Sequence, residues 1–175
     1  VRVHDVNYDH HKRFIEQTQF IRKLNPHLRD ALTVRLQSDW KRHGFNDYDR
    51  WCTILGEGKI DPGTQKFDKV YNKYTLLIFC YESTGFLQAL AGDMPCIGIW
   101  RYAFDFVIPS AHDDYMKMKK VGLIRDNYDD LAEFLNTTDI KTWWYDEEVR
   151  EVRKKFAAVY CNKRPMLNEL LKVMQ

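Results

Sequence analysis

The sequence predicts an α/β fold with a mostly parallel sheet of about five strands. Short apolar runs alternate with segments of helical periodicity along the 175 residues, a pattern typical of chains that build parallel sheets. Residues 76–79 form an apolar run without alternation, as expected of a strand that is covered on both faces. There is no internal repeat and no linker long enough to separate two domains, so residues 1–175 are expected to form a single domain.

The composition excludes several classes of protein. A formal net charge of +2 with 30% charged residues argues against a domain dedicated to duplex nucleic acid, which would be far more basic. No apolar run approaches the roughly 20 residues needed to span a bilayer, so no transmembrane segment is expected. The four cysteines are widely spaced and form no CxxC pair, so we expect reduced thiols rather than disulfides or a zinc site.

The first 74 residues are expected to contain three helices with short strands between them. Apolar side chains recur at helical spacing after Asp9, a suitable N-cap, and Pro26 follows the end of that helix. Gly44 lowers the helix propensity of the second helical segment. The expected helices cover residues 9–24, 40–53 and 64–74, and the expected strands cover residues 1–3, 31–36 and 59–61.

The middle of the chain forms one strand–helix–strand unit. The helix begins at Ser83-Thr84-Gly85, since hydroxyl side chains suit a helix N-terminus. Gly92 ends the helix, Pro95 prevents it from restarting, and residues 96–100 are apolar again. A unit of this length predicts two parallel strands joined by a right-handed helical crossover.

The remaining residues continue the alternation of helices and strands. Pro109 suits the start of a helix, and Asp146 followed by two glutamates suits another. The expected helices cover residues 110–120, 128–135 and 147–160, with a helical turn at 142–145, a last helix from Pro165 and one strand at 121–125.

The turn from Tyr81 to Gly85 is the best candidate for a binding site. It follows a parallel strand, and open α/β sheets bind ligands at the carboxyl ends of their strands. The first amides of a helix are unsatisfied and attract phosphate, Ser83 and Thr84 add hydroxyl donors, and Gly85 lets a ligand approach the backbone. The alternative is an ordinary N-cap. There is no GxGxxG and no P-loop motif, so no sequence pattern supports a dinucleotide or NTPase site.

Three further residues could belong to the same site. Arg35 ends another predicted parallel strand and could pair with a phosphate, although a structural arginine is an equal alternative. Gln88 lies about one helical turn beyond Thr84 and could bind a sugar hydroxyl, unless it is simply solvated. Trp100, with the aromatic residues up to Phe106, could form a wall for a base or sugar ring, with core packing as the alternative.

The histidines offer no metal site. Adjacent His10 and His11 point to different faces of a helix and have no third ligand at a useful spacing, so solvated side chains are expected. His112 lies near the carboxyl edge of the predicted sheet, where a general base is conceivable, but no catalytic residue is assigned.

Residues 80–95, CYESTGFLQALAGDMP, resemble the C-terminal nucleotide-sugar-binding domain of GT-B-fold glycosyltransferases. More narrowly, the chain is similar to a bacterial family of transferases of surface-carbohydrate biosynthesis. The order and spacing of several segments carry this resemblance, and no single one is diagnostic. Besides residues 80–95, these segments are Arg35-Leu36, Ile99-Trp100, Val121-Gly122-Leu123, Trp143-Trp144, residues 148–156 and Tyr160.

The resemblance implies a Rossmann-like three-layer sandwich with helices on both faces of the sheet, forming the C-terminal half of a longer two-domain protein. Such a domain holds the nucleotide diphosphate of a sugar donor, needs no metal and no cofactor beyond that co-substrate, and works with an N-terminal acceptor domain that these residues do not include. The acceptor would be a glycan or glycolipid, in the cytoplasm or peripherally at the inner membrane. The implied donor contacts are Arg35, Tyr81, Ser83, Thr84, Gly85, Gln88 and Trp100.

Several positions depart from the pattern of that family. Glu82 stands in place of Asn, Gly85 in place of Thr, and Gln88 in place of Glu, while residues 37–39 replace a Tyr-Pro-His segment. Glu82 puts a negative charge beside the expected diphosphate. Two alternatives therefore stay open: a non-catalytic module of the same fold used for protein interaction or assembly, and an epimerase-like hydrolase.

Overall fold

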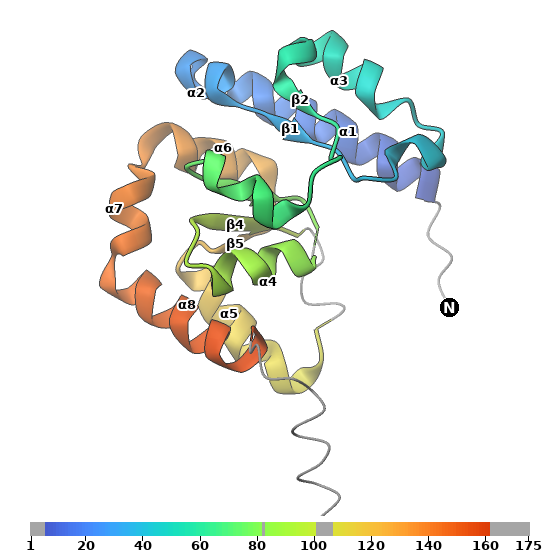
Figure 1. Ribbon diagram of the computed structural model, residues 1–175. Helices are drawn as coiled ribbons and strands as arrows, with labels where there is room; N and C mark the ends of the chain where they lie inside the picture. The colour runs from blue at the N-terminus through green and yellow to red at the C-terminus, as the bar shows by residue number, and fades with distance from the viewer. Residues whose placement is uncertain (1–5, 82, 101–106, 162–175) are drawn as a thin grey trace, which may run out of the picture. The chain divides into compact units, whose positions relative to one another are not determined.

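The computed structural model describes residues 6–81, 83–100 and 107–161, and the chain divides into two compact units (Figure 1). The first unit comprises Val1–Tyr74 and Asn127–Asp139, and the second comprises Thr75–Asp126 and Ile140–Gln175. Two parts of the predicted pattern, the strand at residues 1–3 and the helix from Pro165, lie outside the described residues.

The described strands are all parallel and form two sheets flanked by helices, which confirms the α/β class and is compatible with a Rossmann-like sandwich. Among the described residues these strands form one sheet of three strands and one of two, so the larger sheet has fewer than the five strands expected. Strands expected at residues 31–36 and 121–125 pair over only two residues each. The strands are β1 (Val34–Arg35), β2 (Ile60–Asp61), β3 (Leu77–Phe79), β4 (Cys96–Ile99) and β5 (Ile124–Arg125).

Strands β1 and β5 are shorter than expected because the residues before them adopt other conformations. Helix α2 (Pro26–Ala31) takes the start of the first segment, since proline is well tolerated in the first turn of a helix. In the second segment Gly122 adopts a positive φ of 79°, so the chain turns there before β5 begins.

Helices α1 (Val6–Lys23) and α6 (Tyr128–Thr137) pack together in the first unit. The ring of Phe20 lies 5.6 Å from that of Tyr128, whose hydroxyl accepts a hydrogen bond of 3.2 Å from the Gln17 amide. At the end of α1, Asn136 accepts from the amide of Asn25 at 2.8 Å and donates to the carbonyl of Lys23 at 2.8 Å. One side chain of α6 therefore fixes the turn between α1 and α2.

The sheet of the first unit joins β1 to β2 through α3 (Asp47–Leu55) and the short 3₁₀ turn η2 (Glu57–Lys59). Just beyond the carboxyl ends of both strands, Gly63 adopts a φ of +72°. A Cβ atom added at Gly63 would lie 2.3 Å from the carbonyl oxygen of Leu36. The two segments that leave this sheet therefore approach each other as closely as their backbones allow.

Two expected helices of the first unit are broken. Residues 40–53 divide into the 3₁₀ turn η1 (Trp40–His43) and α3, because Gly44 and Asn46 adopt positive φ angles of 69° and 52°. Residues 64–74 form only the 3₁₀ turns η3 (Phe67–Lys69) and η4 (Tyr71–Lys73), since Val70 between them has a φ of −121°, outside the helical range.

The second unit contains two successive strand–helix–strand crossovers in the order β3-β4-β5. Right-handed crossovers that step in one direction place their helices on the same face of a sheet. Figure 1 shows α4 (Thr84–Ala91), α5 (His112–Lys120) and α8 (Glu147–Tyr160) on one side of these strands. Aromatic rings pack between these helices. The centroid of the Trp100 ring lies 5.0 Å from that of Phe86 in α4 and 6.1 Å from that of Tyr115 in α5. The Tyr115 and Phe156 centroids, in α5 and α8, are 5.2 Å apart.

A buried arginine joins α8 to the short helix α7 (Ile140–Tyr145) and to the turn that follows α4. Arg153 of α8 is 4% exposed, and its guanidinium lies over the Trp144 ring at 4.1 Å from the centroid. Trp144 belongs to α7 and is fully buried. The guanidinium pairs with Asp93, which follows α4 at a φ of 57°. Burial lowers the pKa of Arg153, so the Asp93 carboxylate offsets part of its desolvation.

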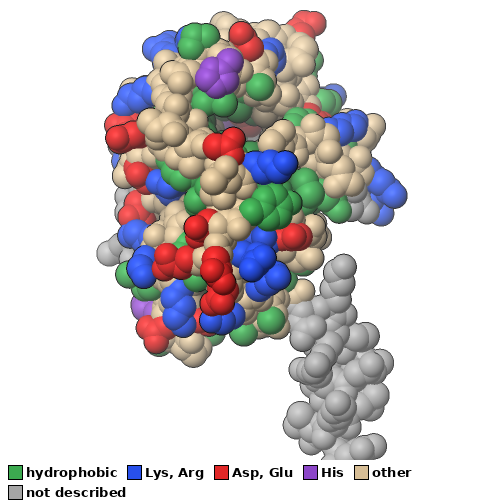
Figure 2. Space-filling model, turned by 90° about the vertical axis from the view of Figure 1, so that its left-hand side faces the viewer, with side chains coloured by type: hydrophobic (Ala, Val, Ile, Leu, Met, Phe, Trp, Pro, Cys, Tyr) green, Lys and Arg blue, Asp and Glu red, His purple; other side chains and the backbone are tan. Residues whose placement is uncertain are grey.

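Charged side chains of both signs are mixed over the face of the molecule that Figure 2 presents. None of the helices within residues 6–81, 83–100 and 107–161 combines the length and the apolar character needed to cross a bilayer.

Replacing Gly63 by alanine is expected to lower the free energy of unfolding by about 2–4 kcal/mol, because the new methyl group meets the Leu36 carbonyl and φ stays positive. Urea denaturation measures this change. Gly58→Ala is the matched control, since a Cβ atom at that position meets nothing within 4 Å. Equal stability of the two variants would show that the two segments do not approach so closely.

Replacing Asp93 by asparagine keeps a residue that tolerates a positive φ but removes the charge that faces Arg153. The free energy of unfolding should fall by about 1–2 kcal/mol, a value reduced for the partial exposure of Asp93. Glu151→Gln, which breaks an exposed pair with Lys155 on the same helix, should leave stability almost unchanged. A neutral result for Asp93→Asn would mean that Arg153 does not depend on this carboxylate.

Candidate functional site

The predicted site residues other than Arg35 lie on segments that leave the carboxyl edge of the β3-β4-β5 sheet. Cys80 and Tyr81 follow β3 there, Ser83 directly precedes α4, Trp100 follows β4 and Asp126 follows β5. Parallel strands in register end at one edge, which is where open α/β sheets place their ligands. The structure thus brings one helix N-terminus and the ends of three strands together.

Helix α4 begins without a side-chain cap. Ser83 has the extended backbone of an N-cap residue, but its hydroxyl makes no capping hydrogen bond. Asn127 caps α6 by accepting from the amide of Asp130 at 2.8 Å, and Asp146 caps α8, whereas α2, α3 and α5 share with α4 the lack of a side-chain cap. The ordinary capping role that the sequence also allowed for Ser83 is therefore not realised. The first amides of α4 remain available to an acceptor from outside the helix.

Gly85 packs closely against the end of β3 and has no positive φ. A Cβ atom at this position would lie 3.0 Å from Cε1 of Phe79, the last residue of β3. The start of α4 therefore lies directly against the end of β3. This contact holds the uncapped amides of Thr84 and Gly85 at the edge of the sheet.

Trp100 is 6% exposed, so it packs in the core, as the alternative interpretation expected. Its indole ring lies over Gly98, where a Cβ atom would be only 2.8 Å from Cζ2. Its indole N–H is buried and has no hydrogen-bond partner among the described residues. A buried donor without a partner carries a desolvation cost that a ligand acceptor can remove. This burial also removes Trp100 from the exposed aromatic surface that a non-catalytic interaction module would use.

The other predicted residues of this edge have different surroundings. Tyr81 is 45% exposed, and Gln88 is exposed one turn along α4 from Thr84. Glu82, whose charge is the main departure from the family pattern, lies outside the described residues, as do the aromatic residues from Tyr102 to Phe106.

Arg35 belongs to the first unit, whereas the residues from Tyr81 to Trp100 belong to the second. Its guanidinium forms an ion pair with Asp61 of β2 and donates to the carbonyl of Gln65. The Asp61 carboxylate also accepts from the amide of Gly63 at 2.9 Å. These contacts fit the structural role that the sequence allowed for Arg35. A contact between Arg35 and a nucleotide-sugar ligand stays a prediction.

The predicted solvated state of both histidines is wrong for His10. Its ring stacks on Phe45 at 3.9 Å, and its Nε2 lies 3.3 Å from the Asp47 carboxylate. Burial lowers the pKa of His10, and Asp47 opposes that shift. Within residues 6–81, 83–100 and 107–161, no three His, Cys, Asp or Glu side chains cluster in a way that could hold a metal ion.

The four cysteines are free thiols, as their spacing predicts. Cys96 in β4 is fully buried, and burial raises the pKa of its thiol. A neutral thiol is a poor nucleophile, so Cys96 serves to pack the sheet.

Sequence reasoning missed Gly98 and Asp61. An i, i+2 pair of glycine and tryptophan on one strand places the indole above the glycine, so the Gly98–Trp100 contact had a local signal. Asp61 lies 26 residues from Arg35 in the chain, and nothing local indicates their pairing.

A comparison with protein-family models matches residues 1–174 to the family described as LIC12162 family transferase. Searches of the curated proteins and of the solved structures found no match. The expected transferase family is thereby confirmed at that level, while the donor-binding role of the sheet edge stays a prediction. The match covers nearly the whole chain, so the chain belongs to the LIC12162 family of transferases.

Proposed function

We propose that this chain holds the nucleotide-sugar donor of a GT-B-like glycosyltransferase that acts in surface polysaccharide biosynthesis. The observation that carries the proposal is the uncapped N-terminus of α4 at the carboxyl edge of a parallel sheet. The buried indole N–H of Trp100, the residue that follows β4, has no partner among the described residues and also supports the proposal. Membership of a transferase family supplies the reaction class.

The first turn of α4 would bind the diphosphate of the donor. Its free amides carry the partial positive charge of the helix dipole, and the hydroxyls of Ser83 and Thr84 can donate to phosphate oxygens. Neutral donors of this kind suit a leaving group whose negative charge grows as the glycosidic bond to phosphate breaks. Gln88, one turn further along α4, would bind a hydroxyl of the ribose or the sugar.

In the reaction, the bond between the anomeric carbon and the phosphate oxygen breaks, and a bond to an acceptor oxygen forms. The electron pair of the broken bond stays with the nucleoside diphosphate, and the acceptor proton passes to a general base. We place that base, and the glycan or glycolipid acceptor, in an N-terminal domain beyond this chain. The whole protein would work in the cytoplasm or peripherally at the inner membrane.

Removing both hydroxyls in Ser83→Ala/Thr84→Ala should weaken nucleotide binding about tenfold or more, since each lost hydrogen bond costs about 1 kcal/mol. Isothermal titration calorimetry with UDP, GDP, CMP and ADP identifies the nucleotide and measures the loss.

The matched control is Thr75→Ala/Ser110→Ala, which removes two exposed hydroxyls elsewhere in the same unit and should leave binding unchanged. If no nucleotide binds the unaltered chain, the donor-site proposal is wrong.

Replacing Trp100 by phenylalanine keeps an aromatic ring but removes the buried N–H. We expect nucleotide affinity to fall about fivefold, the value of one hydrogen bond, with a modest loss of stability from the smaller ring. Trp144→Phe is the matched control, because that indole is also fully buried with an unpartnered N–H among the described residues. The control should lose stability and keep affinity. Equal affinities for the two variants would remove Trp100 from the site.

A further inference from the structure

A pocket of about 470 Å³ lies within the first unit, where the ends of α1 and α3 face α2 and η2. Its size falls in the range of small-molecule sites. None of its lining residues belongs to the edge of the β3-β4-β5 sheet, so the pocket is separate in sequence and in unit from the proposed donor site.

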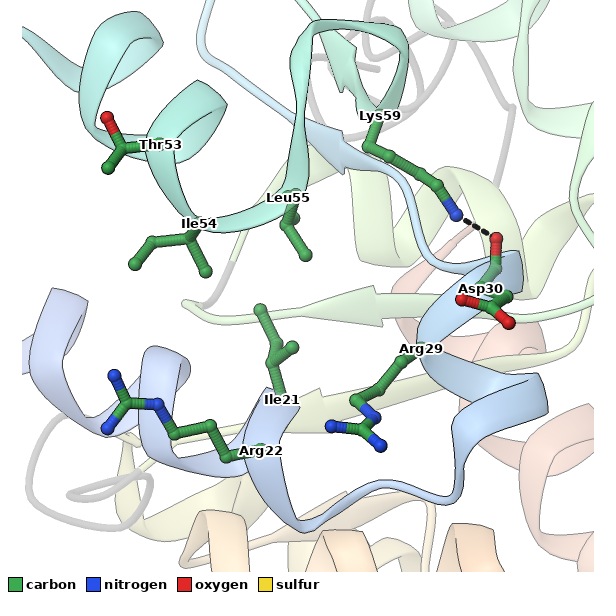
Figure 3. Close-up of a pocket in the computed structure, with 8 residues that line it drawn as sticks. All are labelled: Ile21, Arg22, Arg29, Asp30, Thr53, Ile54, Leu55 and Lys59. Carbon is green, nitrogen blue, oxygen red and sulfur yellow. Dashed lines mark hydrogen bonds between the residues drawn. The ribbon is translucent and has the colours of Figure 1, made fainter.

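One wall of the pocket is apolar. Figure 3 shows the side chains of Ile21, Ile54 and Leu55 pointing toward one another from α1 and α3. Ile21 is 5% exposed and forms the base, whereas Ile54 remains 38% exposed. A ligand with an apolar group would cover Ile54 and remove that surface from water.

The other charged residues that line the pocket are three cations and one anion. The cations are Arg22, Arg29 and Lys59, and the anion is Asp30. Arg22 and Arg29 are exposed, and neither guanidinium has a hydrogen bond or ion pair with another described residue. Lys59 donates to the backbone carbonyl of Asp30 (Figure 3). The neighbouring Lys23, in contrast, pairs with Asp129 at 2.7 Å. Two unpaired guanidinium groups next to an apolar wall are complementary to an anion that carries an apolar group.

The segment between the two arginines is held in place before any ligand binds. Asn136 of α6 bonds both to the carbonyl of Lys23 and to the amide of Asn25, so the turn that separates Arg22 from Arg29 is fixed. On the other side, the amide of Gly56 donates to the carbonyl of Cys52 at 2.8 Å and closes α3. A pocket whose walls are fixed independently loses little entropy when a ligand enters.

We propose that this pocket binds a phosphate ester whose organic group is apolar. Planar guanidinium forks match phosphate oxygens in pairs, which favours phosphate over a single-charge anion. The ends of α1 and α3 and the Asp30 carboxylate add negative potential, so a bare small anion binds weakly. The apolar group supplies the remaining affinity through Ile54 and Leu55. This site would act whether or not the edge of the other sheet binds a nucleotide.

The test is calorimetric titration of the 175-residue chain with butyl phosphate, inorganic phosphate and pentanoate. Butyl phosphate should bind at least tenfold more tightly than inorganic phosphate, since each buried methylene contributes about fourfold. Pentanoate, with the same apolar group and one charge, should bind more weakly than butyl phosphate. Equal binding of pentanoate, or no binding of butyl phosphate, would overturn the proposal.

The double variant Arg22→Gln/Arg29→Gln should lose at least tenfold in affinity for butyl phosphate, and Ile54→Ser should abolish the preference over inorganic phosphate. The control Arg42→Gln/Lys66→Gln removes the same charge from exposed positions outside the pocket and should keep the affinity. An equal loss in the control would show only a general charge effect and would contradict a built site. Nucleotide binding, measured in parallel, should be unchanged in all three variants.

A second arm distinguishes the source of the phosphate. Phosphatidylcholine vesicles that contain phosphatidic acid are sedimented with the chain and with Arg22→Gln/Arg29→Gln. Co-sedimentation that the variant loses assigns a lipid phosphate, while binding of butyl phosphate without vesicle binding assigns a soluble ester. Absence of both kinds of binding would overturn the proposal.

Discussion

The packing of the Trp100 indole over Gly98 is the contact on which the second unit depends. Any side chain at residue 98 would displace the ring, and the ring in turn contacts Phe86 of α4 and Tyr115 of α5. A rigid indole fills the space between two helices that a smaller side chain would leave partly empty. Because Phe86 lies in the first turns of α4, the same contact sets where the uncapped end of that helix meets the edge of the sheet. The position of the candidate site follows from core packing.

Polar contacts link the elements of the first unit around its apolar and aromatic core. Asn136 joins α6 to the turn after α1, and Arg35 joins β1 to β2 through Asp61 and to the following loop through Gln65. Its two-residue strands supply few ladder hydrogen bonds, so side-chain contacts and the close backbone approach at Gly63 replace them. Contacts of this kind join residues that are far apart in the chain, so local sequence patterns do not predict them.

The sequence could predict the elements that have local signals, and it could not predict contacts between distant residues. Strand β3, helix α4 and strand β4 lie within a residue or two of their expected bounds, because apolar runs, Gly92 and Pro95 are local signals. Residues 64–74 were expected to be helical, but Val70, which is 4% exposed, has a φ of −121° and interrupts the helix. The residues of the sheet edge were found from the strand–turn–helix pattern, yet the burial of Trp100 depends on its contacts with Phe86 and Tyr115 from other helices. The pocket between α1, α2 and α3 had no local signal, since it needs three segments to meet.

The two candidate sites differ in the physics by which they would hold an anion. The end of α4 offers directional, uncharged donors that are fixed by the contact of Gly85 with Phe79. Such donors discriminate by geometry, which suits a diphosphate that must be oriented for transfer. The pocket at Arg22 and Arg29 offers full charges on exposed side chains beside an apolar wall, so its affinity depends on the charge of the phosphate and on the burial of an apolar group. Salt screens exposed full charges strongly and partly buried dipoles weakly. A site of the first kind orients a reacting group, whereas a site of the second kind retains a ligand through its charge and its apolar group, and a transferase can use both at once.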